Sequence, residues 1–181
     1  HGPLSHTTEE VMPQLSKLNV QAYKNRRTDI KLSEKLDDGS RKADHEDYTI
    51  KFITDSDLTK AIEKNDLDIG AINVACLIDK TLACDNDFFK EAGVDFRTIC
   101  SQIVSSELDA DRMDYLGRDA YQCGTNYGKV DLEWLLANLT YYRKDDDSLN
   151  LAINRRALYT FDDFLLSRHH MHLMVYFHHK S

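Results

Sequence analysis

A stretch of helical periodicity between residues 108 and 121 constrains the fold more than any other feature of this sequence. Within it, Asp111, Tyr115 and Asp119 are spaced i, i+4, i+8. A helix would project these three side chains from one face, stacked one turn apart. A solvated stripe with ion pairs along it has the same spacing. The pattern therefore predicts a helix and leaves open whether this face binds a ligand.

The last part of the chain repeats this spacing with basic residues. We expect a final helix from about Arg156 to the end, and it carries Arg168, His172 and Tyr176 at i, i+4, i+8. A guanidinium can bind phosphate oxygens through its fork, and a phenol can bind a sugar hydroxyl. This segment is rich in His, so a single His here is more often a surface residue than a ligand. Two helices with complementary ladders, one acidic and one basic, nevertheless favour a binding site.

The rest of the chain predicts a mostly α-helical fold with a small β-hairpin. Two strand-like runs, 140–143 and 149–153, flank a polar turn and predict the hairpin. The segment 17–43 has few large apolar residues, so we expect a surface insertion there, or one that packs poorly. Helical periodicity or helix start signals indicate further helices in 45–53, 55–64, 69–82, 87–92, 96–104 and 130–138.

Composition and charge narrow the classes of function. The chain has 181 residues, of which 41% are hydrophobic and 30% charged, as in an ordinary globular domain. Its net charge of −8 argues against a general nucleic-acid-binding surface, which needs clustered Lys and Arg. No run approaches the roughly 20 apolar residues that span a bilayer, so we expect a cytoplasmic protein without a membrane partner. The four cysteines form no paired motif and are expected to be reduced and largely buried.

Four blocks of sequence carry a resemblance to a known family. They are HGPLSH at 1–6, HE at 45–46, DADRMDYLGRD at 109–119 and SRHHMHLMVYFH at 167–178. In this order they resemble the signature blocks of HD-domain deoxynucleoside triphosphate triphosphohydrolases, and the third block is the most specific. The resemblance implies an HD-domain helical fold over nearly the whole chain. The interval between the first two blocks is longer than the family pattern, which agrees with an insertion in 17–43.

The resemblance also implies a divalent metal ion, without distinguishing Mg, Mn, Fe or Zn. In the family the metal is held by an early His, an adjacent His-Asp pair and an Asp that matches Asp111 here. The other ligands would precede His1, and both ends of the chain look cut. We therefore expect residues 1–181 to be a partial HD phosphohydrolase domain that is inactive by itself, with Asp111 as its contribution to the metal site.

Site roles follow from the same resemblance, position by position. The expected catalytic residues are His1 on a phosphate, His6 near the leaving 5′ oxygen, Glu9 in support of His6, and His45 as a second acid–base group. The expected substrate-binding residues line a nucleotide pocket, with Arg168 on phosphate and Tyr176 and Asp119 near the sugar. The full set of substrate-binding residues is Tyr115, Asp119, Arg168, His172 and Tyr176.

The expected reaction is hydrolysis of a deoxynucleoside triphosphate to a deoxynucleoside and inorganic triphosphate by the full-length protein. Water would attack the α-phosphorus while a His protonates the leaving oxygen. Two alternatives stay open: an HD phosphohydrolase that acts on another nucleotide or phosphate ester, and a nucleotide-binding regulatory module without catalysis. The resemblance further implies a homo-oligomer, either a dimer or a tetramer.

Overall fold

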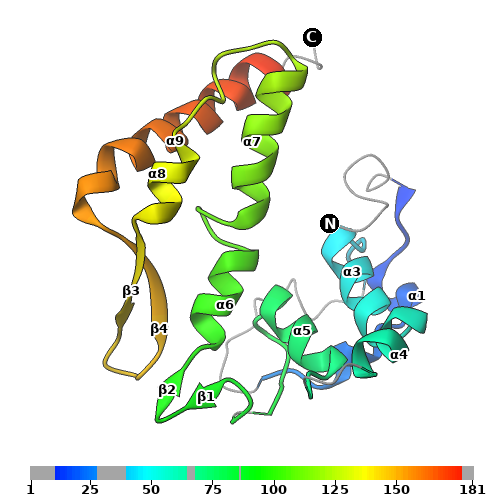
Figure 1. The fold of residues 1–181 in the computed structure, drawn as a ribbon. Helices are drawn as coiled ribbons and strands as arrows, with labels where there is room; N and C mark the ends of the chain where they lie inside the picture. The colour runs from blue at the N-terminus through cyan, green and yellow to red at the C-terminus, as the bar shows by residue number, and fades with distance from the viewer. Residues whose placement is uncertain (1–10, 28–39, 65–67, 86, 177–181) are drawn as a thin grey trace. The chain divides into compact units, whose positions relative to one another are not determined.

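The computed structural model describes residues 11–27, 40–64, 68–85 and 87–176 (Figure 1). The chain divides into two compact units, residues 1–90 and 91–181. Helices dominate both units, and the described residues also form two small two-stranded sheets. The prediction of a mostly α-helical chain with a small hairpin is therefore confirmed. No helix in the described part of the chain is long and apolar enough to cross a membrane.

The first unit is built from short helices. Two of them start where the sequence predicts, because Asp44 and Ser56 each form a capping box that satisfies the free backbone N–H groups of the first turn. The helix expected over 69–82 is shorter than predicted, since the backbone becomes extended at Asp79. The elements are α1 (Leu15–Leu18), η2 (Gln21–Lys24), α3 (His45–Thr54), α4 (Asp57–Glu63) and α5 (Ala71–Ile78).

The core of the first unit corrects one expectation. Residues 17–27 and 40–43 are the described parts of the segment 17–43, which we expected to pack poorly on the surface. Leu18, Val20, Ala22 and Ala43 are instead buried in one apolar cluster with residues of α3 and α5. The expectation is wrong for these parts because small, scattered apolar residues in short elements show no periodicity in the sequence. Whether 17–43 is an insertion relative to the family stays a prediction.

The second unit contains the remaining elements. The helix expected over 87–92 is absent: Ala92 and Gly93 take left-handed backbone angles, φ +49° and +77°, at a tight turn between β1 and β2. The elements are β1 (Lys90–Glu91, which spans the boundary between the units), β2 (Val94–Asp95), α6 (Arg97–Val104), α7 (Ala110–Gln122), α8 (Leu132–Ala137), β3 (Leu139–Arg143), β4 (Leu149–Ile153), η3 (Arg155–Ala157), α9 (Leu158–Met171) and η4 (His172–Tyr176).

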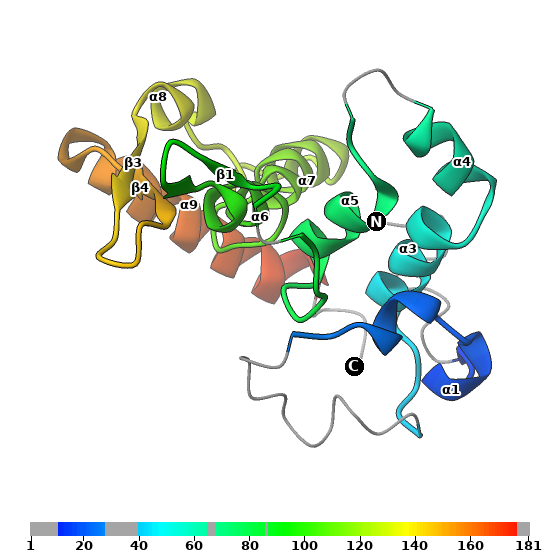
Figure 2. The ribbon, with the colours of Figure 1, turned by 90° about the horizontal axis from the view of Figure 1, so that it is seen from below.

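The predicted hairpin is confirmed. β3 and β4 pair antiparallel, with Leu139 opposite Ile153 and Arg143 opposite Leu149. In Figure 2 the hairpin lies beside α8 and leads into α9. The helices expected over 96–104, 108–121 and 130–138 also form, and their ends differ from the expected ones by no more than two residues.

The packing of α7 against α9 organises the second unit. Leu116 and Ala120 of α7 are buried in one cluster with Phe164 and Met171 of α9 and with Leu135 of α8. Figure 1 shows α7 and α9 running side by side toward the end of the described chain. The two helices that carry the predicted ladders are therefore neighbours in space.

The last helix differs from the expectation at its C-terminal end. The α-helix ends at Met171, and residues 172–176 continue as a π-helical turn, in which each turn is wider than in an α-helix. This irregularity falls on two residues of the basic ladder, His172 and Tyr176. Such turns are frequent at functional sites.

The cysteines agree with the expectation only in part. All four are free thiols, and Cys76 is buried. Cys123, at the C-terminal end of α7, is exposed, so the expectation of burial is wrong for this residue.

Candidate functional site

The second unit contains a cavity of about 420 Å³ between helices α7 and α9. This volume is in the range of small-molecule sites, and the lining combines aromatic, basic and acidic side chains. The lining residues are Glu107, Tyr115, Leu165, Arg168, His169, His172 and Tyr176.

Most of the residues predicted to bind substrate meet at this cavity. Tyr115, Arg168, His172 and Tyr176 line it. Asp119 reaches it through Tyr176, whose hydroxyl donates a 2.7 Å hydrogen bond to Asp119 Oδ2. All five are thus connected, although they come from two helices about 50 residues apart in sequence.

The two tyrosines form one wall of the cavity. Their rings meet edge to face, with centroids 6.1 Å apart. Burial raises the pKa of Tyr176, and the hydrogen bond to Asp119 raises it further. Burial also raises the pKa of Tyr115. Both hydroxyls therefore stay protonated at neutral pH. Tyr176 donates its one proton to Asp119, so towards a ligand its oxygen can act as an acceptor, whereas Tyr115 keeps a proton that it can donate.

The cavity lining also contains an ion pair that the sequence reasoning missed. Arg168 Nη1 donates a 2.5 Å hydrogen bond to Glu107 Oε2. This hydrogen bond, together with the positive charges of Arg168 and Arg112, lowers the pKa of Glu107, so its carboxylate is charged at neutral pH. Arg112 Nη1 lies 3.5 Å from the same carboxylate oxygen. A signal was available, because Glu107 stands four residues before Asp111 and extends the acidic ladder by one step.

The start of α7 holds Glu107 at the edge of the cavity. Asp109 caps the helix, and its carboxylate accepts from the backbone N–H of Arg112 at 2.7 Å and of Ser106 at 3.1 Å. The Arg112 side chain also donates to the Ser106 carbonyl. These contacts fix the backbone on both sides of Glu107, while its own side chain stays exposed.

The remaining predicted site residues are the four catalytic candidates and the metal ligand Asp111. His1, His6 and Glu9 fall outside the described residues, so their predicted roles stay predictions. His45 begins α3 in the first unit, whereas the residues that line the cavity belong to the second unit, so the predicted role of His45 stays a prediction. Asp111 lies on α7 one turn before Tyr115 and does not line the cavity.

A metal ion needs several ligand side chains close together. The described residues contain no group of three or more His, Cys, Asp or Glu side chains placed to hold one. Asp111 supplies a single carboxylate, whereas protein metal sites commonly use three or more ligands. The described part of the chain therefore does not fit a metal site by itself.

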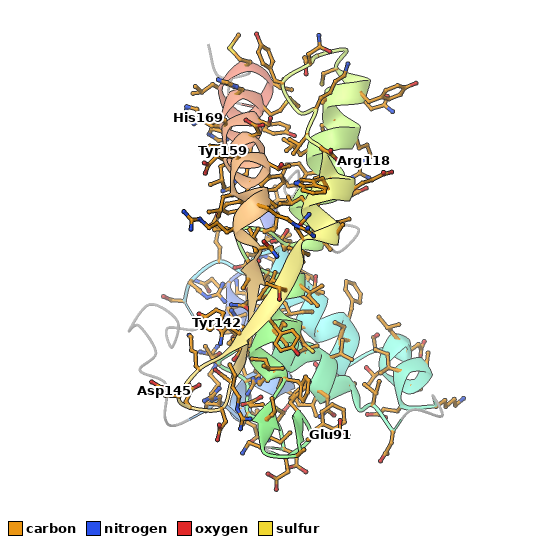
Figure 3. All side chains as sticks on the ribbon, turned by 60° about the vertical axis from the view of Figure 1, so that its left-hand side comes forward. Glu91, Arg118, Tyr142, Asp145, Tyr159 and His169 are labelled. Carbon is orange, nitrogen blue, oxygen red and sulfur yellow. The ribbon has the colours of Figure 1, made fainter. Side chains whose placement is uncertain are left out.

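A second ion pair on α7 provides a reference for the one in the cavity. Arg118 Nη2 lies 2.9 Å from Asp114 Oδ2, and both side chains are exposed. Figure 3 labels Arg118 on α7 and His169, a cavity-lining residue, on α9. The pair between Asp114 and Arg118 resembles the pair between Glu107 and Arg168 in charge and in the exposure of its carboxylate, but Arg118 is more exposed than Arg168 and neither Asp114 nor Arg118 lines the cavity.

Comparison with known proteins gives relatives but no activity. No family model matches this chain. It is 34% identical over 136 residues to the uncharacterized protein YwfO of Bacillus subtilis, which covers 75% of this chain and 27% of that protein. It is 31% identical over 132 residues to the uncharacterized MG461 homolog of Mycoplasma pneumoniae, covering 73% of this chain and 28% of that protein. A shorter match, 38% over 77 residues, is to the uncharacterized protein MJ1154 of Methanocaldococcus jannaschii and covers 42% of this chain and 17% of that protein. The chain thus spans about a quarter of the length of the first two of these curated relatives, and it is similar to parts of longer proteins.

Proposed function

We propose that this chain forms the substrate-holding part of an HD-domain phosphohydrolase that cleaves deoxynucleoside triphosphates to deoxynucleoside and inorganic triphosphate. One observation carries the proposal. The residues that the family resemblance assigns to the nucleotide, on two separate helices, gather at one cavity of suitable size.

One group of residues at the cavity suits the phosphates of such a ligand, and another group suits its sugar. Arg168, with His169 and His172 beside it, offers nitrogen donors to phosphate oxygens. Tyr176 and Asp119, joined by their hydrogen bond, offer a phenol and a carboxylate to the sugar. A tyrosine ring against the sugar edge would exclude a 2′-hydroxyl by contact, which accounts for selectivity toward the deoxy sugar.

The reacting groups belong, in this proposal, to the whole protein. Asp111 contributes one metal ligand, and the resemblance assigns the others to residues before His1. His6 and His45 are the proposed acid–base groups, with Glu9 in support and His1 on a phosphate. The divalent metal and the homo-oligomer are parts of the same proposal.

Product identity tests the proposed reaction. The full-length protein is incubated with each deoxynucleoside triphosphate and a divalent metal, and the products are separated by chromatography. We expect deoxynucleoside and tripolyphosphate. Arg168→Ala should lower kcat/KM by about 10- to 100-fold, because a charged hydrogen bond contributes about 1.5–3 kcal/mol. Arg118→Ala is the matched control, since it removes an exposed guanidinium from α7, one of the two helices that form the cavity. It should change kcat/KM by less than about twofold.

Other outcomes separate the alternatives. Release of a deoxynucleoside monophosphate with pyrophosphate, or turnover of a different phosphate ester, would reassign the substrate or reaction within the HD phosphohydrolases. Nucleotide binding without turnover of any substrate would support a regulatory module instead. Equal activity of Arg168→Ala and Arg118→Ala would remove the cavity from the reaction.

A further inference from the structure

The ion pair at the cavity points to a role for Glu107. We propose that Glu107 is an internal competitor for Arg168, whose guanidinium it holds until the phosphate group of a ligand takes its place. This inference rests on the proposed function, because it names what controls anion binding at the same cavity.

The geometry puts Glu107 where a phosphate would bind. Its Oε2 accepts from Arg168 Nη1 at 2.5 Å, and both residues line the cavity. A carboxylate and a phosphate both present oxygens to a guanidinium in the same way. A ligand phosphate that accepts the same N–H of Arg168 must therefore displace the Glu107 carboxylate.

The exposure of the pair allows this exchange. The Glu107 side chain is 69% exposed and that of Arg168 is 32% exposed. Exposed ion pairs are weak because water competes for both partners, so the contact can open at a cost of only a few-fold in affinity. A negative ligand gains the full contact with Arg168 in return.

Glu107 also forms an ion pair with a second arginine, Arg112. Arg112 Nη1 lies 3.5 Å from the same carboxylate oxygen that Arg168 contacts. When a phosphate takes Arg168, the carboxylate can remain beside Arg112 and does not lose all of its positive neighbours. The Glu107 carboxylate would then give up its contact with Arg168 on α9 and keep its contact with Arg112 on α7.

The exchange has a consequence for the proposed reaction. A triphosphate displaces Glu107, whereas a deoxynucleoside, which has no phosphate, leaves the pair intact. After cleavage, the return of Glu107 to Arg168 favours release of the inorganic triphosphate. Glu107 therefore weakens binding of the substrate's phosphates and of the product to the same extent.

The test measures binding of inorganic tripolyphosphate to the 181-residue chain by ¹H–¹⁵N NMR titration without added divalent metal. Glu107→Gln keeps the side-chain shape and removes the competing charge, and we expect it to tighten binding by about three- to tenfold. Asp114→Asn is the matched control. It changes the net charge equally and breaks an exposed ion pair on the same helix, so it should change binding by less than twofold.

A double-mutant cycle separates competition from simple repulsion between charges. In the Arg168→Ala background Glu107 has no Arg168 to compete for. Glu107→Gln should then change the affinity for tripolyphosphate by no more than Asp114→Asn does. An equal gain in both backgrounds would mean that Glu107 merely repels anions. Weaker binding by Glu107→Gln would mean that Glu107 positions Arg168 for the ligand. Either result, or no change, overturns the inference.

The failure of this inference is distinct from that of the proposed function. If the wild-type chain binds tripolyphosphate and Glu107→Gln does not bind it more tightly, only the inference falls. If no variant binds tripolyphosphate, the cavity is not a site for the phosphate chain, and both fall. If only Glu107→Gln binds it detectably, the inference is supported.

Discussion

Each unit of the molecule contains a contact between a carboxylate and a guanidinium, and the two differ in almost every other respect. In the first unit, Asp47 is 1% exposed and receives two hydrogen bonds of 2.7 Å from Arg41. Tyr23 donates a third at 2.5 Å, and the Asp44 backbone N–H donates a fourth. In the second unit, Glu107 is exposed and receives one hydrogen bond from Arg168.

The difference in burial and in the number of hydrogen bonds indicates that the Asp47 contact is structural, whereas the Glu107 contact can be exchanged for a ligand. Asp47 lies in the first turn of α3 and ties it to η2 and to the residues before the helix, so its oxygens are fully used. A buried charge left without its partner is costly, which keeps such a network closed. Glu107 can exchange its partner for water or a ligand at small cost. The same chemical pair thus stabilises the fold in one unit and suits ligand binding in the other.

The largest effect should come from opening the buried network. Asp47→Asn leaves the Arg41 charge without its bidentate partner and removes two acceptor positions, so we expect a loss of about 3 kcal/mol in the free energy of unfolding. Urea denaturation measures this loss. Glu107→Gln should change the same free energy by no more than about 0.5 kcal/mol. Comparable losses in the two variants would break the contrast between the units.

The loss in Asp47→Asn should also depend on pH. Burial alone would raise the pKa of Asp47, but hydrogen bonds from Arg41 and Tyr23 outweigh it and hold the pKa below its usual value of 3.8. The stability that this carboxylate provides is therefore complete well above pH 3.8 and is lost as the pH falls through the lowered folded-state pKa. The difference between wild type and Asp47→Asn should be constant from pH 7 to 5 and shrink below about pH 3.8 in urea titrations. A difference that grows in acid would contradict the assignment.

A smaller difference in stability is expected between two Tyr→Phe substitutions, one in each unit. Tyr23→Phe removes a donor to the buried Asp47 and should cost about 1.5 kcal/mol of stability. Tyr176→Phe removes the donor of an exposed hydrogen bond to Asp119 and should cost less than about 0.5 kcal/mol. Thermal unfolding of the two variants measures the difference. If Tyr176→Phe were the more destabilising, the hydrogen bond to Asp119 would have a structural role.

The smallest effect concerns the coupling within the exposed pair. A double-mutant cycle of Glu107→Gln and Arg168→Ala should give a coupling free energy of about 0.5 kcal/mol in unfolding, similar to that for Asp114 and Arg118. A coupling above about 2 kcal/mol would show that Arg168 is committed to Glu107 and is poorly available to a ligand.

The sequence predicted the regular elements and most of the cavity, for identifiable physical reasons. The helices α3, α4 and α7 have side-chain caps at Asp44, Ser56 and Asp109, and their apolar residues follow the helical period. The i, i+4 spacing placed Tyr115 and Arg168 on helix faces that the packing of α7 on α9 brings together.

The features that the sequence did not predict depend on contacts between distant parts of the chain or on unusual backbone angles. Glu107 stands one step before the acidic ladder, but that spacing does not reveal its contact with Arg168, which is 61 residues away. Ala92 takes a left-handed angle that residue preferences do not predict for alanine. The π-helical turn after Met171 likewise had no counterpart in the spacing of the basic ladder.

The most direct test of the cavity is the binding of a non-hydrolysable deoxynucleoside triphosphate analogue to the 181-residue chain. Affinities of wild type, Arg168→Ala and Arg118→Ala are measured by NMR titration, with shift changes mapped onto α7 and α9. We expect wild type and Arg118→Ala to bind alike, Arg168→Ala to bind at least about tenfold more weakly, and the shifts to cluster at Tyr115, Arg168 and Tyr176. Equal binding by all three proteins, or shifts confined to other surfaces, would contradict this expectation.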